Sequence, residues 1–216
     1  MVPEYVVIII LGYLLGAIPF GMFVARLTRG VDVREYGSGR TGATNVLRTA
    51  GAKAGVVTLL LDLGKGAAPV AFAWLLLDSH VAQVVAAFSA MVGHNWPIFT
   101  KFRGGRGLAT YLGGLGAMYW PVALGCGLGL GVGIAALTRY MSLGAIFIVV
   151  GSFMTMLFLF LSDLQPAEYL VYTGIGGGLI LFQHRDNIQR LSTGTERKIG
   201  HRAEKKGTWS ADVMKE

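Results

Sequence analysis

The sequence has few charged residues and a single cysteine. Asp, Glu, Lys and Arg make up only 14% of its 216 residues, whereas an average soluble domain has about 25%. Cys126 lies in an apolar stretch, so it can form no intramolecular disulfide and has no cysteine partners for a metal site. This composition excludes a disulfide-stabilised domain and makes a water-soluble fold the poorer explanation.

The sequence contains several long runs of apolar residues. Hydrophobic residues make up 53% of the chain, and its mean hydropathy is +0.56. A bilayer core of about 30 Å needs about 20 apolar residues per helix. We therefore expect an all-α integral membrane protein, a bundle of about seven transmembrane helices, with about five as the alternative. The expected spans are 4–25, 54–77, 80–98, 107–120, 121–137, 141–162 and 166–183.

Basic residues are confined to alternate loops and the C-terminal tail. Of the 19 Lys and Arg residues, 18 follow the first, third, fifth or last expected span, and Lys65 is the exception. By the positive-inside rule, the N-terminus is outside and the C-terminus is cytoplasmic. We expect residues 1–188 to form a transmembrane domain and residues 189–216 a loose polar cytoplasmic tail.

Two features inside the spans concern helix packing. Gly125, Gly129 and Gly133 recur at a spacing of four, which lets helix backbones approach closely in a bilayer. Asp62 and Lys65 lie three apart on one expected helix. Since unpaired charge in lipid is costly, we expect a structural ion pair that faces the bundle interior, with a catalytic role as the alternative.

The first of three polar segments, GSGRTGATNVLR at 37–48, is rich in glycine and hydroxyl groups. Its backbone N–H groups can turn inward as an anion nest, with Ser38, Thr44 and Asn45 as further donors. A flexible connector at the membrane surface is the alternative, because a glycine-rich stretch alone is a weak signal.

Two further polar segments fall on the same side of the membrane. In residues 93–110, a Gly-Gly-Arg-Gly run precedes an expected helix and offers N–H donors to an anion. The basic residues there, Lys101, Arg103 and Arg106, supply charge to that anion or only anchor the helix ends. In residues 182–190, His184 and Asn187 share one helix face. The convergence of three segments favours a site for a phosphorylated ligand.

Four motifs together resemble the bacterial acyl-phosphate-dependent glycerol-3-phosphate acyltransferase family, and the resemblance covers essentially the whole chain. They are GSGRTGATNVLR at 37–48, DLGKGAAP at 62–69, GHNWPIFTKFRGGRGLAT at 93–110 and FQHRDNIQRLSTGTE at 182–196. The family is similar in its seven-span topology and its cytoplasm-facing site.

The resemblance implies transfer of a fatty acyl group from acyl phosphate to glycerol 3-phosphate, giving lysophosphatidic acid and inorganic phosphate. This is the first acylation of bacterial phospholipid synthesis, placed in the cell inner membrane. It requires no cofactor and no metal. We expect a monomer that binds its two substrates and the lipid bilayer, and no nucleic acid.

The resemblance also implies the site residues. By motif position, the catalytic residues are Ser38, Arg48, Arg106, His184 and Asn187. The phosphate-binding residues are Ser38, Gly39, Arg40, Thr44, Asn45, Arg48, Lys101, Arg103, Gly105, Arg106, His184 and Asn187. Many relatives have Lys where this chain has Arg106, so the positive charge is kept but a planar fork replaces a point donor.

The residues leave the proton acceptor open, with a substrate phosphate oxygen as the first hypothesis and His184 as the second. No Gly-x-Ser-x-Gly motif is found, and Cys126 has no basic neighbour in sequence, so a covalent acyl-enzyme is not expected. Two other classes remain as alternatives. One is a transporter for a phosphorylated solute, and the other is a metal-dependent CDP-alcohol phosphotransferase.

Overall fold

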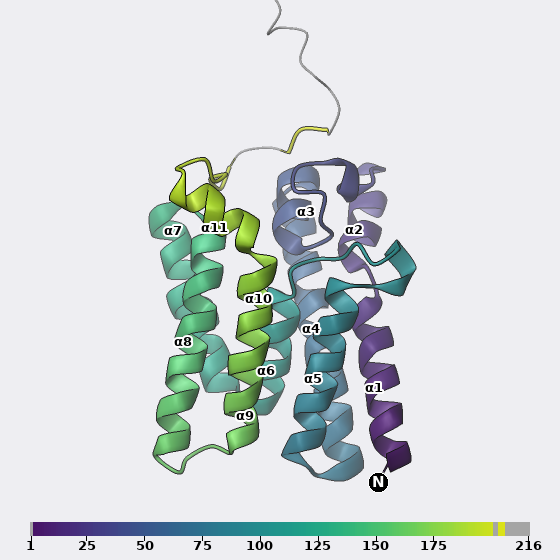
Figure 1. The fold of residues 1–216 in the computed structure, drawn as a ribbon. Helices are drawn as coiled ribbons and strands as arrows, with labels where there is room; N and C mark the ends of the chain where they lie inside the picture. The colour runs from purple at the N-terminus through teal and green to yellow at the C-terminus, as the bar shows by residue number, and fades with distance from the viewer. Residues whose placement is uncertain (1, 201–202, 206–216) are drawn as a thin grey trace, which may run out of the picture.

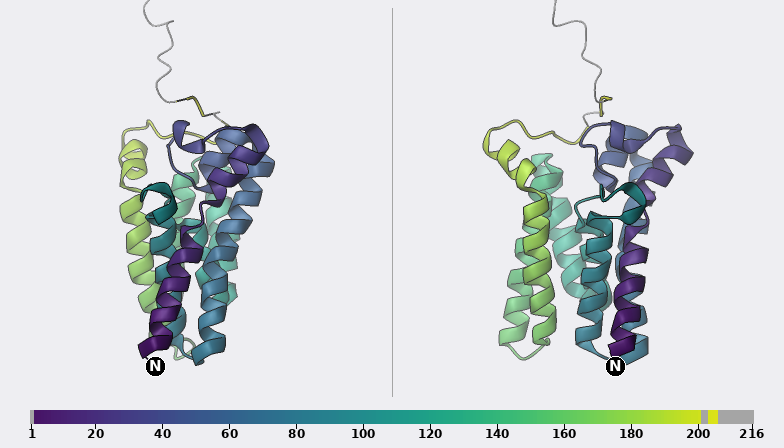
Figure 2. Two further views of the ribbon diagram at one scale, coloured as in Figure 1. Left: turned by 90° about the vertical axis from the view of Figure 1, so that its right-hand side faces the viewer. Right: turned by 45° about the vertical axis from the view of Figure 1, so that its right-hand side comes forward.

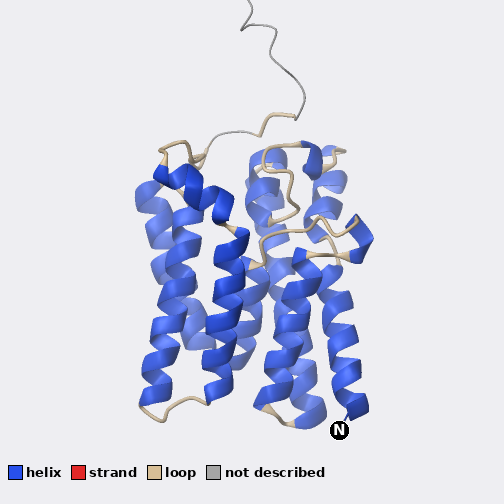
Figure 3. Cartoon of the chain, in the orientation of Figure 1, coloured by secondary structure: helices blue, strands red, loops and turns tan. Residues whose placement is uncertain are grey.

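The computed structural model describes residues 2–200 and 203–205. Over these residues the chain consists of helices and loops, apart from an isolated bridge between Tyr36 and Lys205 (Figure 3). The α-helices are α1 (Val2–Ala17), α2 (Phe20–Arg29), α3 (Ala43–Ala50), α4 (Ala52–Leu77), α5 (His80–Asn95), α6 (Leu108–Leu124), α7 (Gly133–Thr138), α8 (Met141–Leu161), α9 (Ala167–Val171), α10 (Gly177–Gln183) and α11 (Arg185–Ser192). Shorter elements are η1 (Val33–Glu35), η2 (Ile98–Thr100) and the π-helical η3 (Gly125–Val132) and η4 (Tyr172–Gly176).

Four helical segments are long and apolar enough to cross a membrane, which confirms a helical membrane protein. They are Val2–Arg29, Ala52–Leu77, Leu108–Thr138 and Met141–Leu161. Helix α5 and the continuous segment from α9 to α10 run beside them but are shorter (Figure 1). The count of seven spans therefore stays a prediction.

The segment Leu108–Thr138 is a helical hairpin rather than one straight helix. Tyr119 has extended backbone angles, φ −154° and ψ 90°. Pro121 follows, and proline is tolerated in the first turn of a new helix. Beyond the break the chain returns along α6, since a Cβ placed on Gly116 would lie 3.7 Å from the Ala123 Cβ. The two short helices expected over 107–120 and 121–137 are thus both present.

The two ends of the bundle differ in charge. The N-terminus of α1 lies at one end, and α2, α3, α7 and α11 lie at the other (Figures 1 and 2). We call the second the basic end, because α2, α3 and α11 carry Arg29, Arg48 and Arg190, and Arg139 directly follows α7. The separation agrees with the charge pattern expected of alternate loops.

Close helix packing occurs, but not at the glycines expected. Nothing lies within 4 Å of a Cβ built on Gly125, Gly129 or Gly133, so the prediction that these residues bring helices together is wrong. Their spacing of four places them on one face, and within residues 2–200 and 203–205 that face meets no neighbouring helix. A Cβ on Gly16 would instead overlap the backbone of Ala90, where α1 packs on α5.

The expectation of a loose tail is wrong for its described part. Helix α11 continues to Ser192, and Glu196 is only 8% exposed. Ala203 N donates to Arg48 O over 3.1 Å, so this part of the chain packs on α3. A backbone hydrogen bond and a buried carboxylate hold this segment against the bundle. The pattern of charges in the sequence gives no information about either contact. Residues 206–216 of the predicted tail lie outside the described residues.

Candidate active site

The three polar segments meet around one cavity at the basic end. The cavity has a volume of about 200 Å³, and we call it the inner cavity. Helix α3 with the loop before it, the loop before α6, and the junction of α10 and α11 each contribute part of the wall. Of the residues predicted from sequence, Ser38, Arg40, Thr44, Asn45, Arg48, Arg106, His184 and Asn187 line it.

One part of the wall of the inner cavity is apolar. Val56 and Leu59 of α4 and Met141 and Ala145 of α8 line it. Charged and apolar surfaces thus meet within one cavity. Such a space fits a ligand that has an anionic head and an aliphatic chain.

Asn45 shapes the loop that precedes α3. Its side chain is buried, and its Nδ2 donates to the carbonyls of Val33, Tyr36 and Arg40 over 3.0, 3.1 and 2.9 Å. Its Oδ1 accepts from Ser38 N over 3.1 Å. The amide of Asn45 therefore uses its hydrogen-bonding capacity within the protein, and it orients Ser38 toward the cavity rather than adding a donor to it.

Replacing Asn45 by alanine should destabilise the fold. Each buried carbonyl that loses its donor costs about 1–3 kcal/mol, so we expect the free energy of unfolding to fall by about 2–4 kcal/mol. Thermal unfolding in detergent, followed by circular dichroism, measures the change. Thr44→Ala is the matched control, because the Thr44 hydroxyl makes no hydrogen bond to the described residues. Equal destabilisation by the two variants would contradict the role given to Asn45.

Gln183, the last residue of α10, joins two of the arginines. Arg40 Nη1 donates to Gln183 Oε1 and to Gly105 O, both over 3.3 Å. Arg106 Nε donates to Gln183 O over 3.2 Å. These bonds fix both guanidinium groups beside the cavity, and the terminal nitrogens of Arg106 keep no hydrogen bond to the described residues.

The guanidinium of Arg106 is in an unfavourable electrostatic environment. Burial, with the positive charges of Arg40 and Arg190, lowers its pKa to about 10. Arg106 stays charged at pH 7, but water solvates it poorly and its neighbours repel it. A bound anion would relieve both effects, so this part of the cavity is suited to phosphate.

His184 presents an unprotonated nitrogen to the inner cavity. Its Nδ1 lies 2.9 Å from Ile180 O. Because a carbonyl oxygen only accepts, Nδ1 carries the proton and Nε2 is left as an acceptor. Burial and the charge of Arg106 lower the pKa of His184 to about 4. The imidazole is therefore neutral at pH 7.

Glu196 orients the amide of Asn187. Its Oε1 accepts from Asn187 Nδ2 over 2.7 Å and from Ser142 Oγ over 3.0 Å, and its Oε2 accepts from Arg190 Nε over 2.8 Å. A carboxylate only accepts, so the Asn187 nitrogen must face it. The Asn187 Oδ1 has no partner among the described residues and can accept from a ligand hydroxyl.

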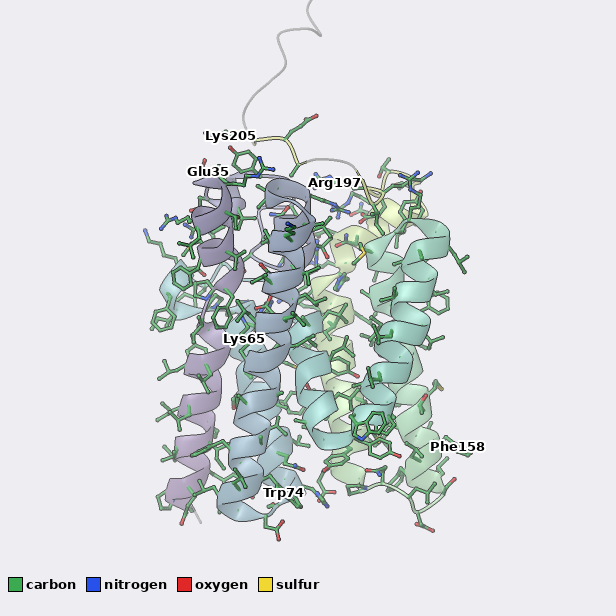
Figure 4. The ribbon with its side chains drawn as sticks, turned by 180° about the vertical axis from the view of Figure 1, so that it is seen from behind. Glu35, Lys65, Trp74, Phe158, Arg197 and Lys205 are labelled. Carbon is green, nitrogen blue, oxygen red and sulfur yellow. The ribbon has the colours of Figure 1, made fainter. Side chains whose placement is uncertain are left out.

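A buried ion pair lies beneath the inner cavity. Lys65 Nζ lies 2.8 Å from Asp62 Oδ1, and their side chains are 4% and 2% exposed. Lys65 also donates to Ile18 O over 2.9 Å. Figure 4 shows Lys65 between the two ends of the bundle. The predicted ion pair is confirmed. Asp62 contributes to the cavity wall as well, so a purely structural role of the pair stays a prediction.

The loop before α6 accepts only glycine at two positions. Gly105 N donates to His94 O over 3.1 Å, and a Cβ on Gly105 would overlap the His94 ring. Gly107 has φ +84°, in the left-handed region that favours glycine. The Gly-Gly-Arg-Gly run therefore brings the Arg106 backbone close against the end of α5.

Four of the predicted site residues lie away from the inner cavity. Gly39 and Arg103 line a second, larger cavity. Lys101 is exposed and lines neither cavity. Gly105 is a buried residue of the loop before α6 and also lines neither cavity. Sequence reasoning gave no role to Gln183 or Glu196. Both stand in the fourth motif, which was the available signal, but spacing alone does not reveal a hydrogen-bond partner.

Comparison with known proteins gives a consistent result. Residues 6–194 match the family described as Glycerol-3-phosphate acyltransferase. The chain is 44% identical to Glycerol-3-phosphate acyltransferase 3 of Dehalococcoides mccartyi (strain CBDB1), over 94% of this chain and 99% of that protein. It is also 44% identical to the Glycerol-3-phosphate acyltransferase of Rubrobacter xylanophilus, over 92% and 96% of the two chains.

Two crystal structures of the integral membrane glycerol 3-phosphate acyltransferase PlsY (YgiH) have the same fold. The glycerol 3-phosphate form has a TM-score of 0.82 and the lysophosphatidic acid form one of 0.81. Each is 40% identical to this chain and covers 91% of it, and 96% of the solved chain is matched. Family match, sequence identity and shared fold agree: this chain belongs to the glycerol-3-phosphate acyltransferase family.

Proposed function

We propose that this protein transfers a fatty acyl group from acyl phosphate to glycerol 3-phosphate, releasing lysophosphatidic acid and inorganic phosphate. The observation that carries the proposal is the inner cavity, where arginines and an apolar wall meet. Both substrates are anionic, and one of them has an aliphatic chain. The forms in which PlsY was solved support glycerol 3-phosphate as acceptor, and the acyl-phosphate donor rests on the four sequence motifs.

The apolar wall gives the acyl chain a path from the bilayer. Val56 and Leu59 of α4 and Met141 of α8 line the inner cavity, and each is exposed on the bundle surface. The chain would lie between α4 and α8, with its phosphate among the arginines. The acyl chain could then reach the inner cavity from the bilayer without passing through water.

The chemistry requires orientation more than activation, because an acyl phosphate is already a mixed anhydride. The acceptor hydroxyl oxygen attacks the acyl carbon, the new ester bond forms, and the acyl carbon–oxygen bond breaks as phosphate leaves with the electron pair. Holding both substrates in place supplies about 7–11 kcal/mol of barrier reduction. Arg48 and Arg106 offset repulsion between the two phosphates, and a donor aimed at the developing oxyanion adds about 2.7–4 kcal/mol.

The hydroxyl proton passes to a phosphate oxygen of the substrate. His184 Nε2 and Asn187 Oδ1 are both acceptors, so one of them can accept from the hydroxyl of glycerol 3-phosphate that does not react, which leaves the proton of the attacking hydroxyl free for the phosphate. With a pKa of about 4, His184 is a weak base at neutral pH. Its role is therefore orientation of glycerol 3-phosphate.

The His184→Gln variant tests this role. Glutamine keeps an acceptor, so we expect turnover to fall by less than about hundredfold, whereas loss of an obligatory base costs about 10²–10⁴-fold. The pH profile of turnover between pH 5.5 and 8 should keep its shape. Loss of nearly all turnover, together with loss of an ionisation seen in the native enzyme, would identify His184 as the base instead.

The same histidine predicts how stability depends on pH. The unfolded chain takes up this proton near pH 6.5, but the folded chain does so at about 4. As pH falls from 6.5 toward 4, the unfolded state therefore gains protons first and the folded state loses stability. Unfolding in detergent at pH 7.5 and pH 5 measures the loss, which should be smaller in His184→Gln. Equal acid sensitivity of both proteins would contradict the lowered pKa.

Phosphate release by the purified protein tests the proposed function. With palmitoyl phosphate and glycerol 3-phosphate in the presence of EDTA, we expect inorganic phosphate and lysophosphatidic acid in equal amounts. Omission of glycerol 3-phosphate should abolish the release. Folded protein that takes up glycerol 3-phosphate into vesicles without acyl transfer would favour a transporter. Loss of activity in EDTA would favour the alternative of a metal-dependent phosphotransferase.

The proposed setting is the bacterial inner membrane, with the basic end in the cytoplasm and the protein as a monomer of seven spans. Arginines of α2, α3 and α11, with Arg139 after α7, gather at the end opposite the N-terminus, which supports this orientation. Glycerol 3-phosphate would then reach the inner cavity from the cytoplasm, as expected for a water-soluble metabolite.

A further inference from the structure

A second cavity lies beside the inner one and is larger, with a volume of about 660 Å³. We call it the outer cavity. It lies where the loop after α5 meets the junction of α10 and α11 and the loop around η1. Helices α5 and α10 are on the near side in Figure 1, whereas α4, which lines the inner cavity, is on the near side in Figure 4. The two cavities are therefore lined by different sets of helices, although they share Arg40.

The charge in the outer cavity is positive once internal pairs are taken into account. Asp32 is paired with Arg34 over 2.6 Å, and Glu35 with Lys205 over 3.4 Å. The other lining charges are Arg40, Arg103 and Arg185. The Arg103 side chain is exposed, and its guanidinium makes no hydrogen bond or ion pair with the described residues. Arg185 lies 3.9 Å from Asp186 Oδ1, but both side chains are more than half exposed, so water screens this pair. An anion would therefore find cationic groups that the protein neutralises little or not at all.

Guanidinium groups favour one kind of anion. Planar N–H forks match the oxygens of a phosphate, and a dianionic phosphate monoester gains more from several arginines than a singly charged diester does. Asn95 also lines the outer cavity, is 2% exposed, and has no partner for either side-chain polar atom among the described residues. The lining thus combines charge with buried amide groups.

Aromatic side chains on the rim connect the outer cavity to the bilayer. Trp96, Phe102 and Phe182 line it, and the two phenylalanines are 59% and 57% exposed. Arg185 lies over the Phe182 ring, 4.6 Å from its centroid. Tryptophan and exposed phenylalanine beside arginine are typical of the membrane interface, where lipid head groups lie. A ligand held there can keep its acyl chains in the bilayer.

Arg40 stands between the two cavities. It lines both of them, and its bonds to Gly105 O and Gln183 Oε1 hold it in place. A phosphate in the outer cavity and one in the inner cavity would each contact the same guanidinium from a different side.

We propose that the outer cavity is a second phosphate site, which binds the phosphate monoester head group of a membrane lipid, with Arg103 and Arg185 as its main cationic contacts. The site is separate from the one where acyl transfer is proposed. It does not depend on the acyl donor, since it is defined by binding alone.

Native mass spectrometry of the intact protein in a nonionic detergent tests this proposal. Dioleoyl phosphatidate is the probe, and saturating glycerol 3-phosphate occupies the inner cavity. We expect one tightly bound phosphatidate and no comparable binding of dioleoyl phosphatidylcholine. In the Arg103→Gln/Arg185→Gln variant, phosphatidate affinity should fall at least tenfold. The matched control is Arg29→Gln/Lys53→Gln, which removes two exposed charges near the same end that line neither cavity.

The outcomes distinguish specific binding of phosphatidate in the outer cavity from non-specific electrostatic attraction of anionic lipid to the basic end. Unchanged affinity in Arg103→Gln/Arg185→Gln, or an equal loss in the control variant, would overturn the proposal. Displacement of phosphatidate by millimolar inorganic phosphate would reassign the site to a soluble phosphate. Both substituted arginines are exposed, so the variant should fold, and its melting temperature in detergent checks this. No turnover is measured, so failure here leaves the acyltransferase proposal untouched.

Discussion

Arg106→Met should lower kcat/KM for glycerol 3-phosphate by about 10²–10³-fold, equivalent to about 2.7–4 kcal/mol. Arg106 lines the inner cavity, its Nε is held by Gln183 O, and its terminal nitrogens make no hydrogen bond to the described residues. Methionine keeps most of the side-chain volume but removes the charge. Initial rates of phosphate release at varied glycerol 3-phosphate measure the loss.

Two further variants show whether charge at this position is the cause. Arg106→Lys keeps the positive charge and loses the bond to Gln183 O, so it should retain at least about tenfold more activity than Arg106→Met. Arg29→Met removes an exposed charge from α2, outside both cavities, and should stay within about twofold of the native enzyme. Equal losses in Arg106→Lys and Arg106→Met would contradict an electrostatic role.

Lys65→Met should lower the free energy of unfolding by about 3–5 kcal/mol, because it leaves a buried carboxylate without its partner. The Asp62 side chain is only 2% exposed, and Lys65 Nζ is 2.8 Å away. Unfolding in mixed micelles, followed by circular dichroism, measures the change. Lys53→Met is the matched control, since Lys53 is exposed in the same helix, and it should change stability by less than about 0.5 kcal/mol.

The double variant Lys65→Met/Asp62→Asn distinguishes a lost ion pair from lost packing. Neutralising the carboxylate removes the uncompensated charge, so the double variant should recover a large part of the stability lost in Lys65→Met. If the double variant is no more stable than the single one, the unpaired charge is not the cause. Activity of the double variant then shows whether Asp62, which lines the inner cavity, also affects the reaction.

Much of the architecture follows from patterns visible in the sequence. Apolar runs predicted the helices, and the break at Tyr119 falls one residue before the expected end of the first of the two short spans. The spacing of His184 and Asn187 correctly indicated that the two residues face one place, since both line the inner cavity. Helical periodicity and charge placement suffice for such predictions, because they report which face of an element a residue occupies.

Sequence patterns could not predict which residues, distant in sequence, become hydrogen-bonding or packing partners in the fold. Asn45 was expected as a phosphate donor, yet four backbone groups use its amide. Glu196 had no predicted role, although it orients Asn187 from a segment expected to be loose. The glycine spacing at 125–133 predicted a packing face that meets no helix. Each of these differences concerns the residues that a side chain or helix face contacts. Those contacts depend on how the helices assemble into the bundle.

Comparison of two acyl donors tests the central claim most directly. Detergent-purified protein would receive glycerol 3-phosphate with radiolabelled palmitoyl phosphate or palmitoyl coenzyme A, and labelled lysophosphatidic acid would be measured. We predict product from palmitoyl phosphate alone, with one inorganic phosphate released for each lysophosphatidic acid formed. Product from palmitoyl coenzyme A, with none from palmitoyl phosphate in the same folded preparation, would contradict the proposed reaction.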